Sequence, residues 1–167
     1  MATTMGQALA ERIRYQTESG KKVLEAAGDH HGAVFGNPAD VLTVTGNVSD
    51  IAYTNHLWLL DAVASGAVKA DLGEELSKTR PATVEQAVDF LGARETDTPA
   101  QAIDSLKKVN DRFSTLVKGL SDEEMEAPVE VTFYGQKSLR DLLFIVIEHG
   151  SLHLGQSWGI LKGKGAA

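Results

Sequence analysis

Three helix-start signatures are the features that most limit how this chain can fold. Thr4, Thr83 and Thr98 are each followed three residues later by a glutamine. This is the capping-box pattern, in which the threonine and glutamine side chains bond backbone N–H groups at the first turn of a helix. Pro99 follows Thr98 and suits the first helical position, where a backbone N–H is not needed. A chain with these starts is expected to be mainly helical.

Apolar residues recur at three- and four-residue spacing along much of the chain, which predicts long amphipathic helices. Asn47 is assigned as the cap of the second long helix, and Ser138 opens the last. The four predicted long helices cover residues 4–28, 47–66, 98–119 and 138–162. The fold class that follows is all-α, a four-helix bundle with crossover connections and short extra helices.

The connections between these helices are long enough to cross the bundle. Residues 29–46 are rich in glycine and are predicted to be a crossing loop. Residues 67–97 are predicted to hold two short helices, one over Lys69 to Lys78 and one that opens at Thr83. Residues 121–124 suggest one acidic helical turn, and Val129 to Gly135 alternates like an extended segment or a minor hairpin.

Composition narrows the classes of protein to consider. The 167 residues fit one domain, assigned here to 1–167, with a sizeable core. With 16 basic and 23 acidic residues the net charge is −7, which argues against a nucleic-acid-binding surface. The sequence contains no apolar run of the roughly 20 residues that span a bilayer and no secretory signal, so no membrane association and a cytoplasmic location are expected. The absence of cysteine excludes disulfides, zinc-thiolate sites and a cysteine nucleophile.

Two histidines in the last helix carry the strongest chemical signal. His149 and His153 stand four residues apart, so their imidazoles share one helical face and are able to bind one cation. The same pair also occurs as core histidines that are satisfied by hydrogen bonds. Because Gly150 follows His149, the segment is not the His-Glu-x-x-His motif of metalloproteases.

A third histidine on the second helix favours the metal interpretation. His56 lies on the predicted inner stripe, and facing helices of a bundle bring such residues together. Alone, His56 is more simply a packing residue. Three neutral histidines with open positions suit zinc, nickel, cobalt or iron(II). Three polar residues near these histidines in sequence could orient an imidazole: Asn55, Asp61 and Gln156. His30 and His31, in the glycine-rich loop, are expected to be solvated.

The pattern His149-x-x-x-His153-x-Gly155-Gln156, with a lone histidine on the second helix, resembles the DinB/YfiT-like metalloenzyme superfamily. Leu154 departs from the arginine that is common at that position of the family motif. Residues 47–63 and 120–124 also resemble parts of the family. The resemblance covers nearly the whole chain and is loosest over the loop 29–46 and the segment 67–97.

This resemblance implies a four-helix bundle, often a homodimer, in which His56, His149 and His153 bind a divalent metal ion such as zinc or nickel. Relatives include transferases and isomerases that use bacillithiol, mycothiol or glutathione. The leading expectation is therefore a metal-dependent enzyme that activates such a low-molecular-weight thiol for transfer to a small electrophile. The alternatives are a non-catalytic metal-binding dimer in stress response, a hydrolase that uses bound hydroxide, and a metal-free bundle with core histidines.

Overall fold

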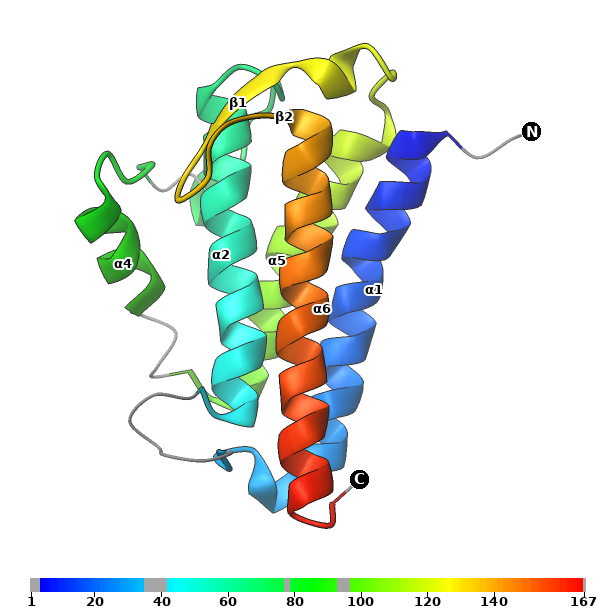
Figure 1. Ribbon diagram of the computed structural model, residues 1–167, viewed down its shortest axis with the longest axis vertical. Coiled ribbons are helices and arrows are strands. Elements are labelled where there is room, and N and C mark those ends of the chain that lie inside the picture. Colours follow the sequence, from blue (N-terminus) through cyan, green and yellow to red (C-terminus); the bar gives the residue numbers. More distant parts are fainter. Residues whose placement is uncertain (1–3, 35–41, 77–78, 93–96, 167) are drawn as a thin grey trace.

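Four long helices lie side by side and form the body of the molecule (Figure 1). The computed structural model describes residues 4–34, 42–76, 79–92 and 97–166. The long helices are α1 (Met5–Ala27), α2 (Val44–Ala64), α5 (Pro99–Lys118) and α6 (Leu139–Gly163). Helices α1 and α2 each pack against both α5 and α6, so α1 and α2 stand on opposite corners of the bundle. The predicted all-α bundle is confirmed.

The predicted caps set the ends of three of these helices. Thr4 and Thr98 both form complete capping boxes, with Gln7 and Gln101 respectively, and Pro99 begins α5. The Ser138 side chain accepts a hydrogen bond from the backbone N–H of Asp141 and so caps α6. These contacts satisfy N–H groups that the helix itself leaves without partners.

The start of α2 differs from the prediction. Thr43 caps the helix, because its hydroxyl oxygen accepts a hydrogen bond from the backbone N–H of Gly46 at 2.8 Å. Helix α2 therefore begins at Val44, and the assignment of Asn47 as the cap is wrong. Asn47 lies inside the helix, and its Nδ2 donates to the backbone oxygen of Thr43 at 2.9 Å.

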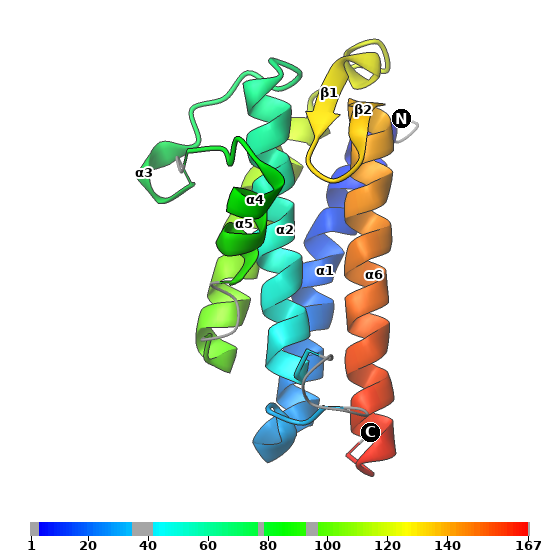
Figure 2. The ribbon, with the colours of Figure 1, turned by 60° about the vertical axis from the view of Figure 1, so that its left-hand side comes forward.

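The connections give the bundle a crossover topology. Helices α2 and α5 run in the same direction, so the chain returns along the outside of the bundle through α3 (Gly73–Leu76) and α4 (Val84–Gly92) (Figure 2). This confirms the predicted crossover and the helix that opens at Thr83. A short 3-10 helix, η1 (Gly28–His30), follows α1. Parts of two predicted segments lie outside the described residues, namely 35–41 of the crossing loop and both 77–78 and 93–96 of the segment 67–97.

A small hairpin joins α5 to α6 at one end of the bundle. After the 3-10 helix η3 (Glu124–Glu126), strand β1 (Pro128–Val131) pairs with β2 (Gly135–Ser138) in antiparallel register. The buried carboxylate of Asp61 on α2 ties the hairpin down, since it accepts hydrogen bonds from the backbone N–H and the hydroxyl of Thr132 at 2.7 and 3.0 Å. Arg80 pairs with the same carboxylate at 2.5 Å. The predicted minor hairpin is thus confirmed.

A layer of polar side chains separates two apolar halves of the core. Gln16 of α1, Asn55 of α2 and Asn110 of α5 are almost fully buried and bond one another, with Asn55 donating to both of the others. Gln16 also donates to the backbone oxygen of Val146 on α6 at 2.9 Å, so the layer links all four helices. Buried amides that bond one another across neighbouring helices specify the register of those helices.

Among the described residues, no helix combines the length and the apolar character that crossing a bilayer requires. The assignment of residues 1–167 to one domain stays a prediction.

Candidate metal centre

Two histidines and one aspartate meet between α2 and α6. The Nε2 atoms of His149 and His153 are 3.1 Å apart. The Oδ2 atom of Asp50 lies 3.2 Å from the Nε2 of His149 and 3.1 Å from that of His153. Within the described part of the chain, these three residues form a group whose donor atoms are close enough to hold one metal ion.

The helices position the three side chains at the edge of the core. His149 and His153 are one turn apart on the same face of α6, as the predicted spacing requires, and both extend toward Asp50 of α2. Asp50 extends from the second turn of α2. The exposed fractions of the side chains are 9% for Asp50, 13% for His153 and 18% for His149. The group is therefore largely removed from water but not fully enclosed.

The Asp50 carboxyl is held in its charged form. Burial alone would raise its pKa, but the hydrogen bonds and charges of His149 and His153 outweigh burial and bring the pKa well below its ordinary value. A carboxylate that is ionised and mostly buried needs positive charge beside it. A metal ion or protons on the histidines would supply that charge.

Asn47 sets the orientation of His153. Because the Nδ2 of Asn47 donates to the backbone oxygen of Thr43, its Oδ1 is the atom that faces His153, and the Nδ1 of His153 donates to it at 2.7 Å. With the hydrogen on Nδ1, the Nε2 of the neutral ring carries a lone pair and is ready to bind a metal ion. Such an outer partner is typical of histidine ligands.

The charges and spacing of the three donor atoms fit a divalent cation. With Nδ1 protonated, the lone pair of His153 Nε2 and the Asp50 carboxylate face each other at 3.1 Å, which is unfavourable unless positive charge lies between them. Two donors bound at about 2.1 Å to one ion lie about 3.0 Å apart at right angles and about 3.4 Å apart at the tetrahedral angle. The three observed separations of 3.1, 3.1 and 3.2 Å fall in this range.

Replacing Asn47 by alanine is expected to weaken metal binding without abolishing it. The variant removes the acceptor that fixes the His153 ring but leaves the three donor atoms in place. Loss of an outer partner of this kind costs about 10- to 100-fold in affinity. Competition with a fluorescent zinc chelator would measure the change. Ser157→Ala on α6 is the control, because its hydroxyl donates to the backbone oxygen of His153 and not to the ring.

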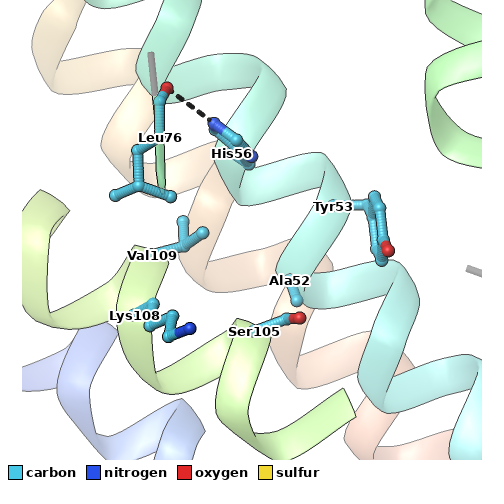
Figure 3. A pocket seen from close by; sticks show the side chains of 7 residues that line it. All are labelled: Ala52, Tyr53, His56, Leu76, Ser105, Lys108 and Val109. Carbon is cyan, nitrogen blue, oxygen red and sulfur yellow. Dashed lines mark hydrogen bonds between the residues drawn. The ribbon is translucent and has the colours of Figure 1, made fainter. Parts of the chain in front are cut away.

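His56 does not join the other two histidines in this structure. It extends from another side of α2, and its Nε2 lies 3.0 Å from the backbone oxygen of Leu76 (Figure 3). The ring of His56 also packs edge-on against Phe90 of α4, with centroids 5.5 Å apart. It lines a pocket of about 270 Å³ between α2 and α5, together with residues that include Tyr53 and Lys108. The structure thus places Asp50 where the sequence led us to expect His56.

The polar residues suggested as outer partners have other contacts. Asn55 belongs to the buried polar layer, and Asp61 binds the hairpin. Gln156 is exposed, as are His30 and His31. Sequence reasoning missed Asp50 as a donor and Asn47 as the residue that orients His153. Their spacing of three residues on α2, which puts both side chains on one face, is the signal that could have found them.

One comparison with known proteins identifies the family of the chain. The model of the DinB superfamily matches residues 38–157, a range that contains Asp50, His56, His149 and His153. No curated protein and no solved structure matches the chain. Since the matched range covers more than half of the sequence and ends within α6, this chain belongs to the DinB superfamily.

Proposed function

We propose that this protein is a divalent-metal-dependent enzyme that activates a low-molecular-weight thiol for transfer to a small electrophile. Bacillithiol, mycothiol and glutathione are the thiols that the family resemblance suggests. Asp50, His149 and His153 would hold the metal ion. The homodimer that the resemblance implies and the cytoplasmic location expected from the sequence are retained as parts of the same proposal.

The observation that carries the proposal is the convergence of the three donor atoms at 3.1 to 3.2 Å from one another. Two helices hold these atoms, and Asn47 fixes one imidazole in the form that a metal ion needs. Such groups are costly to keep close together in a protein interior unless a cation joins them. A metal ion is the simplest cation that accounts for two imidazoles and a charged carboxylate at one point.

The donor set leaves room for an external ligand. Two histidines and one carboxylate neutralise one of the two charges of a divalent ion, so one positive charge remains to attract an anion. A divalent ion in such a site supplies the chemistry of lowering the pKa of a bound thiol or water. Because the chain has no cysteine, any thiol must come from outside, which agrees with the use of a free thiol cofactor.

The donor set also guides the choice of metal. Two histidines and one carboxylate with open positions are the ligands of non-haem iron(II) enzymes, and they also suit zinc. The set differs from the three neutral histidines expected from the sequence, which leave the full charge on the ion. Iron(II), which the sequence also allowed, is therefore tested beside zinc and nickel.

The test of thiol activation uses protein in which the metal is replaced by cobalt(II). Addition of glutathione, bacillithiol or mycothiol is expected to produce a sulfur-to-cobalt charge-transfer absorption band that saturates at one thiol per metal. The S-methylated form of the same thiol is the control, since it has no proton to lose and cannot form a thiolate. Equal spectra with the free and the methylated thiol would contradict thiol activation.

A second result would separate the thiol enzyme from the hydrolase. If the cobalt protein takes up metal but shows no band with any of the three thiols, bound hydroxide becomes the better nucleophile. Protein that takes up no metal at all would contradict both enzymes and would leave a helical bundle with three packed histidines.

A further inference from the structure

We propose that Tyr134, packed against the buried Trp58, is an aromatic recognition surface for the molecule that reacts at the metal centre, and that this molecule carries an aromatic or flat apolar group. The inference rests on the proposed function, because it takes Asp50, His149 and His153 to be the metal site. The inference extends that function by naming the class of substrate and the residues that select this substrate.

Trp58 connects the metal centre to the hairpin. Its ring packs edge-on against the His149 ring, with centroids 5.2 Å apart, and edge-on against the Tyr134 ring, with centroids 6.0 Å apart. The ring centres of His149 and Tyr134 are therefore no more than about 11 Å apart, which a small organic molecule can span. Trp58 itself is almost fully buried, so Tyr134 is the ring of this series that presents a surface to an incoming molecule.

The hairpin holds Tyr134 in place although much of its ring is in water. Tyr134 is 49% exposed and lies in the turn between β1 and β2. The turn lies in front of the bundle between α2 and α6, the two helices that carry the metal centre (Figure 2). The bonds from Thr132 to Asp61 fix the turn on α2, and the indole N–H of Trp58 lies 3.4 Å from the backbone oxygen of Thr132. An exposed aromatic ring on an anchored turn loses little conformational freedom when it binds a ligand.

Phe133 adds an independent sign that the turn serves more than folding. Its φ is +73°, in the left-handed region where glycine or asparagine is favoured and a bulky residue is strained. Phe133 is 47% exposed, so packing against the rest of the protein does not fully explain why a phenylalanine occupies this position. Strained backbone with exposed apolar side chains is typical of binding sites. The turn thus carries two neighbouring exposed aromatic side chains, and the Tyr134 ring is linked to the metal centre through Trp58.

The chemistry of this surface favours one kind of ligand. Aromatic side chains attract flat apolar groups through ring-to-ring contacts and through removal of apolar surface from water. A molecule with a metal-binding head and an aromatic body would place its head between α2 and α6 and its body against Tyr134. A small polar molecule would bind the metal but gain nothing from the turn.

A matched pair of metal-binding probes tests the inference. Acetohydroxamate and benzohydroxamate share the same metal-binding head and differ in a methyl against a phenyl group. With zinc-loaded protein, titration calorimetry should show benzohydroxamate binding about tenfold more tightly, the ratio expected from one good aromatic contact. In Tyr134→Ala this ratio should fall to about twofold while the dissociation constant of acetohydroxamate is unchanged. Phe133→Gly should also lower the ratio without lowering the melting temperature, because glycine suits the turn.

Tyr15→Ala is the matched control, since Tyr15 is another exposed tyrosine, at 58%, on the outer face of α1. The ratio of the two hydroxamate affinities in Tyr15→Ala should equal the ratio in the wild type. Equal affinities for the two hydroxamates in the wild type, or an undiminished ratio in Tyr134→Ala, would overturn the aromatic surface while leaving the metal centre intact. Failure of the protein to take up zinc or to bind acetohydroxamate would instead contradict the metal centre, and the inference would fall with it.

Discussion

Replacing Asp50 by alanine should abolish stoichiometric metal binding, whereas replacing His56 by alanine should leave it near one metal ion per chain. Asp50 supplies the only charged donor of the group of three, and its carboxylate lies within 3.2 Å of both imidazoles. Two neutral imidazoles alone would keep a weak site. We expect the affinity to fall by more than the roughly 100-fold that loss of an outer partner can cause.

Elemental analysis of untagged protein, purified without added metal or chelator, measures this effect in parallel for the wild type and the variants. Asp50→Asn is a second variant, since it keeps the size of the side chain and removes the charge. His149→Ala and His153→Ala should also lose the metal. The decisive contrast is between the two variants of α2, Asp50→Ala and His56→Ala. Retained metal in Asp50→Ala together with loss in His56→Ala would support the three-histidine site and would contradict the assignment of Asp50.

Helix α2 shows why the sequence did not predict that Asp50 lies beside His149 and His153. Nearly all of its residues are buried, so its apolar residues do not mark one face. The expected stripe through His56 faces α4 and α5, while Asp50 faces α6. Asp50 precedes His56 by six residues, which turns the side chain by roughly 240° around the helix. His149 and His153 lie four residues apart on one helix, so their proximity could be predicted from spacing alone. It does not depend on knowing which face of another helix is turned toward them.

The helix caps show where local sequence was enough to predict the structure. Thr4, Thr98 and Ser138 act through contacts three residues away, so local sequence was enough to place these helix starts. Asn47 was misplaced because Thr43, four residues earlier, offers the same kind of side chain. Contacts between residues that are far apart in the sequence produce no local sequence pattern from which they could be predicted. The bonds from Asp61 to Thr132 join positions 71 residues apart, and only the folded chain brings them together.

Replacing Gly150 by alanine should destabilise the fold strongly. A Cβ atom at this position would lie 2.2 Å from the Nε2 and 2.6 Å from the Cδ of Gln16. Gln16 cannot move aside easily, because it is buried and bonded to Val146 and Asn55. Overpacking of this kind costs about 1–3 kcal/mol, and breaking the buried hydrogen bonds costs about 1–3 kcal/mol more. The gain of about 1 kcal/mol from replacing glycine in a helix offsets only part of this.

Two glycines of the same helix provide the control for this prediction. Gly155 and Gly159 have no heavy atom within 4 Å of an added Cβ among the described residues. Gly155→Ala and Gly159→Ala should therefore raise the free energy of unfolding by up to about 1 kcal/mol, the helix propensity difference. Gly150→Ala should lower it by about 2–4 kcal/mol, measured by urea denaturation. If all three variants gained stability alike, Gln16 would be free to rearrange, and the polar layer would not hold α1 and α6 in register.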